Sequence, residues 1–364
     1  MGRGKTPPKR KTAAPKRKAA TKRTVARKSA AAKKPVRRAT KDLTLSFATG
    51  PYDRMEALWT GEAKPKGIAL DVTRVEQPHA LFDMVLDEGK FDAAEFGIST
   101  TIAHAVTGDK SFVHLPIFPS KMFRHSYIFI NRRGPIKEPK DLAGRRIGCP
   151  TYGQVAAIWC RGHLMHEYGV DLSNVTWVQG SIDHAGSHGS GLRPIKVHKP
   201  VKLEKAPPDK SLQQLLIDGE IDAIVGASRP SLFGKHPDLV RIFPDARKEE
   251  REFFARTGIH PIMHDVVIRR SVYDRNPWIA QSLYDACEEA KARADKKLRY
   301  GGAQRVMLPW LADDMEEIDR LWGGKPWAYG VEANRKTLQT LIQYMEEQGV
   351  IPSRPRVDDL FVSV

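Results

Sequence analysis

Two histidines in this chain occupy equivalent positions in a repeated pattern. Each precedes an apolar strand that ends in two arginines: His125 is followed by residues 126–131, and His264 by residues 265–268. Because histidine titrates near neutral pH, such a pair can supply a general acid and a general base. Each can also be a hinge histidine hydrogen-bonded to a backbone carbonyl. We favour the catalytic interpretation because the two positions are paired.

Glu95 is the third residue whose position points to chemistry. It ends a predicted buried strand, where an ionised carboxylate is costly without a partner. Glu95 can therefore act as a base or form a structural ion pair. With His125 and His264 it would also make two histidines and one carboxylate, a ligand set for a divalent metal. These three residues are scattered in the sequence, so we expect catalysis without a metal.

The strands that carry these residues are repeated too. Residues 92–99 and 222–228 both have Asp-Ala, a short apolar strand and then small or polar residues. Together with the histidine repeat, this predicts an α/β protein of two similar lobes. The strands after His125 and His264 are expected to cross between the lobes side by side. A ligand is expected in the cleft, where the carboxyl ends of strands converge.

The order of strands and helices predicts a discontinuous first lobe. Strands and helices alternate from Leu43 onward, as in α/β proteins. Ser99 is expected to cap a helix, and residues 180–208, rich in Gly, Ser, His, Lys and Pro, form a long surface loop. We expect lobe one in residues 42–126, lobe two in 127–264 and a return to lobe one in 265–364, with helices over 278–298, 313–322 and 332–347.

Residues 1–41 differ in charge from the rest of the chain. They contain 17 Lys and Arg and no acidic residue, whereas residues 42–364 hold 43 basic and 43 acidic residues. Their few apolar side chains do not offset the entropy of ordering, so we expect a disordered tail. Such a polycation can bind nucleic acid or another polyanion without reading sequence. It can equally be a solubilising extension, or reflect a start codon assigned too early.

The cysteines and apolar segments bear on the cellular compartment. Cys149, Cys160 and Cys287 have no metal-binding spacing and form no even disulfide set, which favours a reducing compartment. No apolar run approaches the roughly 18 residues that cross a membrane. No apolar segment follows the basic N-terminus, as a secretory signal would require. We therefore expect a cytoplasmic protein without a membrane partner.

Five longer motifs are spread over the neutral part of the chain. They keep a fixed order, which makes them more specific than any short pattern. They are GPYDR at residues 50–54, FPSKMFRHS at 118–126, KDLAGRRIG at 140–148, TGIHPIMH at 257–264 and WAYGVEANR at 327–335.

KDLAGRRIG is similar to type II periplasmic binding proteins in general, and the other four motifs resemble 4,5-dihydroxyphthalate decarboxylases. The resemblance runs from about Leu43 to the C-terminus and leaves out the basic tail. Pro51 and His260 differ from the residues usual in that family. The resemblance implies a two-lobed, periplasmic-binding-protein type II-like fold used as an aromatic decarboxylase.

The implied reaction converts 4,5-dihydroxyphthalate to 3,4-dihydroxybenzoate (protocatechuate) and CO2 without a redox or electron-sink cofactor. Each carboxylate has a hydroxyl para to it, so the protein must supply a base, an acid, cations for the dianion and a dry cavity. The catalytic candidates are His125, His264 and Glu95. The candidates for binding carboxylates or hydroxyls are Arg54, Arg124, Arg161, Arg229, Tyr52, Ser99, Ser120 and Tyr152.

Each of these interpretations has an alternative. The arginines can form salt bridges, the serines can cap helices, and Arg161, which shares a helix with Trp159, can lie on a solvated face. The same fold also serves as the solute-binding subunit of ABC importers for small anions, without chemistry. The missing export signal and the histidine pair favour the enzyme. The ring substituents of the substrate, metal dependence and oligomeric state are left open.

Overall fold

The structure is a computed structural model that describes residue 2 and residues 42–186 and 196–364. The chain divides into two units, Met1–Thr40 and Lys41–Val364, and the second unit is the body of the protein. The predicted disordered tail and the middle of the predicted loop 180–208 lie outside the described residues. Within the described ranges, no helix combines the length and the apolar composition needed to span a membrane.

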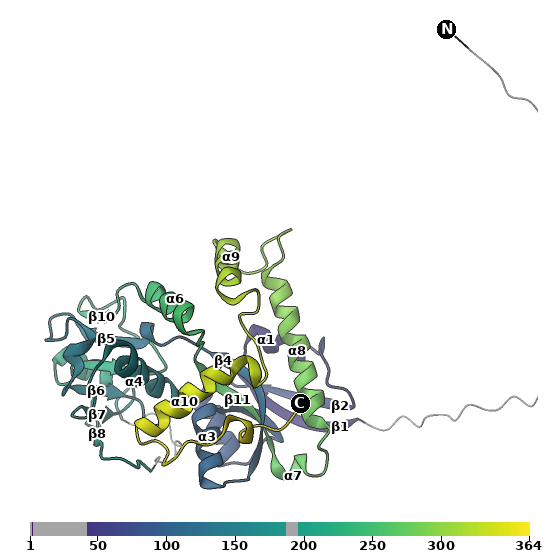
Figure 1. The fold of residues 1–364 in the computed structure, drawn as a ribbon, viewed down its shortest axis with the longest axis horizontal. Helices are drawn as coiled ribbons and strands as arrows, with labels where there is room; N and C mark the ends of the chain where they lie inside the picture. Colours follow the sequence, from purple (N-terminus) through teal and green to yellow (C-terminus); the bar gives the residue numbers. More distant parts are fainter. Residues whose placement is uncertain (1, 3–41, 187–195) are drawn as a thin grey trace, which may run out of the picture. The chain divides into compact units, whose positions relative to one another are not determined.

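A five-stranded sheet, sheet one, forms the first lobe, with strand order β2-β1-β3-β11-β4 (Figure 1). β1, β2 and β3 run parallel, whereas β11 is antiparallel to both of its neighbours, β3 and β4. β3 and nearly all of β11 are buried, as their continuous apolar runs predict. The strands are β1 Leu43–Thr49, β2 Ile68–Arg74, β3 Ala93–Gly97, β4 Phe112–Lys121 and β11 Ile262–Arg269.

A six-stranded sheet, sheet two, forms the second lobe, with strand order β10-β5-β9-β6-β7-β8. β9, β6, β7 and β8 run parallel, and β5 is antiparallel to β9 and β10. Each sheet therefore combines parallel strands with an antiparallel strand that follows a crossing, which confirms the predicted two-lobed α/β fold. The strands are β5 Ile128–Asn131, β6 Arg146–Cys149, β7 Thr176–Gln179, β8 Lys202–Lys205, β9 Ala223–Val225 and β10 Leu239–Arg241.

Helices pack around both sheets, with α4 against α10 and α1 against α8 (Figure 1). The three helices predicted in the last ninety residues of the body are confirmed as α8, α9 and α10. The helices are α1 Asp53–Trp59, α2 Pro78–Leu86, α3 Ile98–Thr107, α4 Val155–Tyr168, α5 Leu212–Asp218, α6 Ala246–Thr257, α7 Arg270–Tyr273, α8 Ile279–Leu298, α9 Leu311–Trp322 and α10 Arg335–Glu347, with short 3-10 turns at His125–Tyr127, Pro139–Leu142, Glu332–Asn334 and Val357–Asp359.

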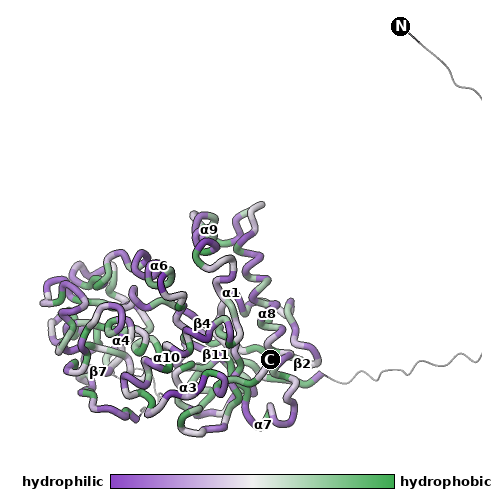
Figure 2. The backbone as a smooth tube through the Cα atoms, in the orientation of Figure 1, coloured by the Kyte–Doolittle hydropathy of each residue, from purple (hydrophilic) through white to green (hydrophobic). Residues whose placement is uncertain are grey.

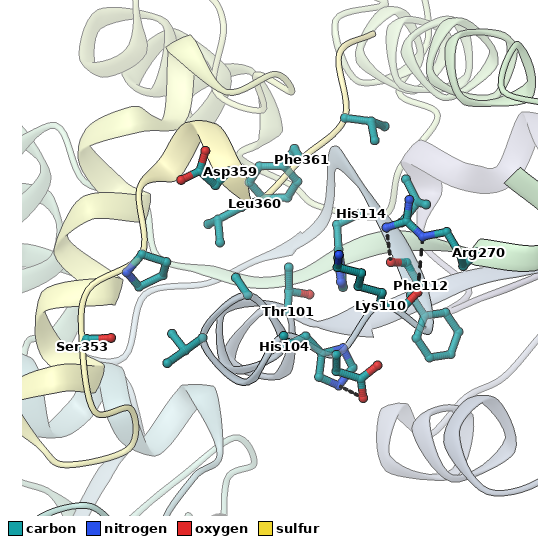
Figure 3. Close-up of a pocket in the computed structure, with 17 residues that line it drawn as sticks. Thr101, His104, Lys110, Phe112, His114, Arg270, Ser353, Asp359, Leu360 and Phe361 are labelled. Atoms are coloured by element: carbon teal, nitrogen blue, oxygen red, sulfur yellow. Dashed lines mark hydrogen bonds and ion pairs between the residues drawn. The ribbon is translucent and has the colours of Figure 1, made fainter. Parts of the chain in front are cut away.

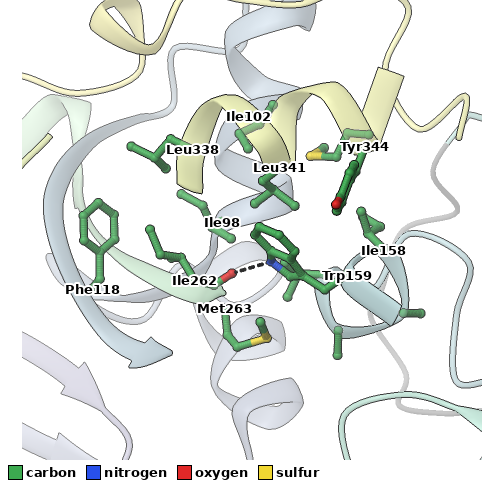
Figure 4. Packing of buried hydrophobic residues seen from close by; sticks show 14 of the residues in the cluster. Ile98, Ile102, Phe118, Ile158, Trp159, Ile262, Met263, Leu338, Leu341 and Tyr344 are labelled. Carbon is green, nitrogen blue, oxygen red and sulfur yellow. Dashed lines mark hydrogen bonds between the residues drawn. The ribbon is translucent and has the colours of Figure 1, made fainter. Parts of the chain in front are cut away.

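The largest apolar cluster connects elements of both lobes. Trp159 of α4 is fully buried, and its Nε1 donates a hydrogen bond of 3.0 Å to the carbonyl of Ile262 in β11 (Figure 4). Gly162 allows α4 and α10 to approach closely, because a Cβ there would lie only 1.9 Å from the ring of Tyr344. Apolar segments of β4 and β11 run through the interior of the body (Figure 2).

The prediction that the strands after His125 and His264 cross side by side is wrong. β5, after His125, belongs to sheet two and β11 belongs to sheet one, so these strands do not lie side by side. The neighbouring crossing segments come earlier: Lys121 pairs with Ile262, and the amide of Met122 donates to the carbonyl of Pro261 at 2.9 Å. The chain crosses before His125 because β4 continues to Lys121. The expected boundary at residues 264/265 falls inside β11, and the lobe ranges stay predictions.

Candidate active site

Polar side chains gather at the carboxyl ends of β1 and β3. Tyr52 follows β1 by three residues, and Glu95 lies near the end of β3. β11 brings His264 beside them, because His264 pairs with Gly97, two residues after Glu95. Ser120 on β4 pairs with His264 from the other side. Four of the residues selected from the sequence therefore lie together.

The carboxylate of Glu95 is completely buried and hydrogen-bonded at both oxygens. Oε2 accepts from the amide of Gly50 at 2.8 Å and from the hydroxyl of Thr49 at 3.1 Å. Oε1 accepts from the hydroxyl of Tyr52 at 2.7 Å and lies 2.5 Å from Nδ1 of His264. Several donors around one buried carboxylate favour its ionised form.

These contacts give Glu95 and Tyr52 different protonation states. Burial by itself raises the pKa of Glu95, but the hydrogen bond and charge of His264, with hydrogen bonds from Gly50 and Tyr52, bring that pKa below its ordinary value. Burial and then the Glu95 carboxylate raise the pKa of Tyr52. At neutral pH Glu95 is therefore ionised, and Tyr52 keeps its proton as a hydrogen-bond donor.

The ionised Glu95 also fixes the histidine beside it. We assign the proton on Nδ1 of His264, because that nitrogen faces the carboxylate at 2.5 Å. The imidazole packs edge-on against Phe82, with 5.1 Å between ring centroids. Nε2 of His264 is not among the enclosed, unpartnered polar atoms of the described residues. With Nδ1 held by the carboxylate, Nε2 is the ring nitrogen left to exchange a proton with a ligand.

Arg54 lies beside this cluster and contacts its tyrosine. Its guanidinium carbon is 4.3 Å from the ring centroid of Tyr52 and 4.1 Å from that of Trp327. Nε donates to the carbonyl of Pro119 at 2.5 Å. A cation therefore lies next to the residues that surround Glu95, and its role in carboxylate binding stays a prediction.

Arg124 lies in the crossing segment and is only 4 % exposed. Nε lies 3.2 Å from the sulfur of Met263 in β11, and Nη1 donates to the carbonyl of Ala227, which follows β9, at 3.2 Å. In the described ranges no carboxylate lies within ion-pair distance of this guanidinium. Burial lowers the pKa of Arg124. A buried cation with neutral partners is suited to an anion.

Ser99 contacts the second lobe and does not cap a helix. α3 begins at Ile98, and Gly97 occupies its N-cap position, so the expected cap is wrong. The Ser99 hydroxyl donates to the carbonyl of Gly153, just before α4, at 3.3 Å. The serine is therefore placed between the two lobes.

The polar groups of Arg161 and Tyr152 form hydrogen bonds with other residues of the chain. Arg161 is 1 % exposed, so the alternative of a solvated face is wrong. It donates from Nη2 to the carbonyl of Tyr152 and from Nε to the side chain of Gln348, both at 2.6 Å. The Tyr152 hydroxyl donates to the carbonyl of Gln348 at 3.0 Å. These contacts attach α4 to the end of α10, whereas Arg229 is exposed.

His125 is not brought to Glu95 and His264. Its ring stacks on His163 at 4.5 Å and packs against Phe253 in the second lobe, because the chain has already crossed. Both of its ring nitrogens are enclosed without a hydrogen-bond partner among the described residues, so the hinge contact to a carbonyl is also not formed. Burial, then the charge of Arg256, lowers the pKa of His125 to about 4. Its catalytic role stays a prediction.

The metal alternative requires Glu95, His125 and His264 to converge on one point. In the ranges that the structure describes, no three His, Cys, Asp or Glu side chains are placed to hold a metal ion. The scattered two-histidine, one-carboxylate set is therefore not assembled.

A second histidine–carboxylate pair lies on the opposite face of sheet one. Asp265 follows His264 in β11, so the two side chains point to opposite faces. Its carboxylate accepts from the hydroxyl of Thr101 at 2.9 Å and lies 3.3 Å from Nδ1 of His114 on β4. Burial raises the pKa of Asp265. Nε2 of His114 is enclosed and has no partner in the described ranges.

His114 of this second pair lines a pocket of about 480 Å³ between α3, β4 and the C-terminal segment, whose lining includes Phe361 (Figure 3). Neither Asp265 nor His114 is predicted as a site residue from the sequence, because a histidine inside an apolar strand carries no motif. Trp327 and Lys121 are likewise not predicted as site neighbours, although both lie in motifs that resemble a family. The resemblance of these motifs to the family is the sequence feature that could have identified Trp327 and Lys121 as neighbours of the site.

Comparison with known proteins finds relatives by sequence and proteins of similar fold by structure. Residues 66–191 match the family model described as NMT1/THI5 like. A 4,5-dihydroxyphthalate decarboxylase of Comamonas testosteroni is 32 % identical over 322 residues, which cover 88 % of this chain and 96 % of the relative. One of Pseudomonas putida is 30 % identical over 213 residues, covering 58 % and 81 %.

Among solved structures, the periplasmic aliphatic sulphonate binding protein SsuA from Escherichia coli matches with a TM-score of 0.50 and 12 % identity, over 88 % of this chain and 97 % of that one. At this identity the likeness concerns the fold alone. It confirms the periplasmic-binding-protein fold that the KDLAGRRIG motif predicts.

Proposed function

Because the chain belongs to the 4,5-dihydroxyphthalate decarboxylase family, we propose that it releases CO2 from a dihydroxylated aromatic dicarboxylate without oxidation. The proposed substrate is 4,5-dihydroxyphthalate, and the products are 3,4-dihydroxybenzoate and CO2. The observation that carries the proposal is the 2.5 Å contact between the buried, ionised Glu95 and Nδ1 of His264. It leaves Nε2 as a nitrogen that can exchange a proton with a ligand.

The proposed chemistry needs one proton and no electron acceptor. Loss of the phenolic proton para to the departing carboxylate raises electron density at the ring carbon that carries it. Protonated His264 donates from Nε2 to this carbon. The bond to the carboxylate then breaks, its electron pair restores the aromatic ring, and CO2 leaves. The phenolic proton passes to solvent and returns to the product phenolate, so the net reaction consumes one proton, which ends on the ring carbon that CO2 leaves.

The neighbouring residues have distinct roles in this proposal. Glu95 stays ionised and stabilises the imidazolium form of His264 before transfer. Tyr52, whose proton is donated to Glu95, accepts a hydrogen bond from a catechol hydroxyl, and Ser120 donates or accepts one. Arg54 and Arg124 bind the two carboxylates, because a guanidinium matches a carboxylate in a fork. The reaction runs in the proposal without a metal or an organic cofactor.

Incubation of the full-length protein with 4,5-dihydroxyphthalate tests the proposal. CO2 release and formation of 3,4-dihydroxybenzoate at equal rates are expected, with no change after dialysis against a chelator. Phthalate, which lacks the para hydroxyls, is the control and should release no CO2. Binding of 4,5-dihydroxyphthalate without CO2 release would contradict the proposal, because a solute-binding protein behaves in that way.

The buried guanidinium of Arg124 offers a second test. Arg124→Lys should raise KM by about tenfold and change kcat little, because lysine keeps the charge but loses the planar fork. Steady-state kinetics with 4,5-dihydroxyphthalate measures both constants. Unchanged constants would show that Arg124 only supports the crossing segment.

A further inference from the structure

The guanidinium of Arg54 is held from several directions. The rings of Tyr52 and Trp327 lie 4.3 and 4.1 Å from its central carbon. Nε donates to the carbonyl of Pro119, and Nη1 lies 3.1 Å from the exposed carboxylate of Asp53. In the described part of the chain, Nη2 has no partner. The two rings fix the plane of the cation, and the Nε bond fixes its rotation within that plane.

An irregularity in β4 provides the acceptors for this arrangement. The pairing of β11 with β4 shifts register between His264 and Val266, opposite residues 116–119. Two of these residues are prolines, which cannot donate to a ladder. Three carbonyls of residues 116–119 accept hydrogen bonds from outside the ladder. Pro116 accepts from the amide of Gly330 at 2.8 Å, Phe118 from Nε1 of Trp327 at 2.9 Å, and Pro119 from Nε of Arg54.

A buried lysine fixes the turn that carries Trp327. Lys121 is 6 % exposed, and its ammonium donates to the side chain of Asn334 at 2.6 Å and to the carbonyl of Ala328 at 2.9 Å. Asn334 in turn donates to the carbonyls of Ala328 and Gly330. A buried ammonium with neutral partners is costly. Its contacts all serve to hold residues 328–334 against β4.

The indole is supported on a further side by His260, whose ring meets Trp327 edge-on at 5.3 Å and stacks on Phe123 at 4.8 Å. Trp327 therefore has a fixed orientation that does not depend on a ligand. Without the support of Trp327 and Tyr52, the long side chain of Arg54 would sample many rotamers.

We propose that Trp327 is a positioning residue that holds Arg54 ready for the carboxylate that is not lost, and so makes the site prefer 1,2-dicarboxylates over monocarboxylates. This inference rests on the proposed function, because it assigns one of two substrate carboxylates. The Tyr52 ring that supports Arg54 also places its hydroxyl on Glu95, so the cation and the proton-transfer pair share one support. Neither of these contacts requires Trp327 to touch the reacting atoms.

Calorimetric titration of the full-length protein with phthalate and with benzoate tests the inference. Phthalate is unreactive and offers two carboxylates, whereas benzoate offers one. The wild-type protein should bind phthalate about tenfold more tightly or better, as expected for one added charge-assisted contact. Trp327→Leu and Arg54→Lys should each reduce this preference to about twofold. Trp327→Phe, which keeps a ring but cannot donate to Phe118, should fall between.

Trp310→Leu is the matched control, because Trp310 is 71 % exposed and should leave the preference unchanged. With 4,5-dihydroxyphthalate, Trp327→Leu should raise KM more than it lowers kcat, since His264 is intact. If the protein releases CO2 but both Trp327 variants keep the wild-type preference for phthalate, the inference about Trp327 is overturned and the proposed function stands. If the wild-type protein neither binds phthalate nor releases CO2, the proposed function fails first. Should Trp327→Leu not fold, Trp327→Phe and Arg54→Lys decide the outcome.

Discussion

The pairs Glu95–His264 and Asp265–His114 contain the same chemical groups and lie on opposite faces of one strand, β11. In both, a buried carboxylate meets Nδ1 of a histidine, at 2.5 Å and 3.3 Å. They differ at the far side of the ring. Nε2 of His114 is enclosed without a partner, whereas Nε2 of His264 is not enclosed in this way. The enclosure of the second ring nitrogen, rather than the pairing itself, distinguishes the two pairs.

The strongest test of this comparison removes the accessible histidine. His264→Ala should lower kcat by about 100-fold or more, and Glu95→Gln by a similar factor, because the acid is lost or loses the carboxylate that positions it. CO2 release measures the effect, and circular dichroism checks folding. His198→Ala, at an exposed histidine, should keep full activity. Turnover within threefold of wild type in His264→Ala would remove this histidine from the mechanism.

Breaking the enclosed pair should instead reduce stability. Asp265→Asn replaces one of the two acceptor oxygens by a donor amide, so Thr101 and Nδ1 of His114 no longer each face an acceptor oxygen, which should lower the free energy of unfolding by about 2–3 kcal/mol. Urea unfolding measures this change, with the exposed Asp285→Asn as control. The folded variant should keep kcat within about threefold. A large loss of kcat at unchanged stability would show that the second face also takes part in catalysis.

His125 and His163 extend the comparison to histidines with no carboxylate at all. Burial lowers the pKa of His125 to about 4 and that of His163 well below its ordinary value. Between pH 6.5 and 4 the unfolded chain therefore binds protons that the folded protein does not, so stability falls as the pH falls through this range. The loss is on the order of 3 kcal/mol for His125 alone.

Urea unfolding across this pH range measures the loss, and His125→Phe should reduce it to the contribution of His163 while keeping kcat. An unchanged profile would contradict the assignment of His125 as neutral and buried. A fall in kcat of about 100-fold would instead support the catalytic role that the sequence predicts for it.

The smallest effect on catalysis is expected from the basic tail. We propose that residues 1–41, with 17 cations and no anion, bind nucleic acid or another polyanion without sequence preference. On duplex DNA the logarithm of affinity should fall with the logarithm of salt concentration, with a slope of about −0.9 per phosphate contacted. Gel shifts of full-length and truncated protein measure this. Truncation should abolish binding and leave kcat unchanged; equal DNA binding by both proteins would refute the proposal.

The sequence predicted the two-lobed fold well because strand patterns and family-like motifs are local. It also selected Glu95 and His264 from their places in strands. It did not distinguish His264 from His125, because each precedes an apolar strand and a pair of arginines. The difference depends on where the chain crosses, which is decided by the pairing of Lys121 with Ile262 over a distance of about 140 residues. The positions of His114 and of the carbonyl that accepts from Trp327 also depend on the long-range pairing of β4 with β11, so a local sequence pattern does not predict them.

The position of β11 between β3 and β4 also affects how the protein is made. β3 and β4 leave the ribosome early, but the strand that joins them in one sheet ends at Arg269. Contacts between residues this far apart in sequence form slowly. Throughout synthesis of the second lobe, the facing edges of β3 and β4 have no partner strand in this sheet. Glu95 meets His264 only after most of the chain has been translated, so a product that stops before β11 lacks the Glu95–His264 contact.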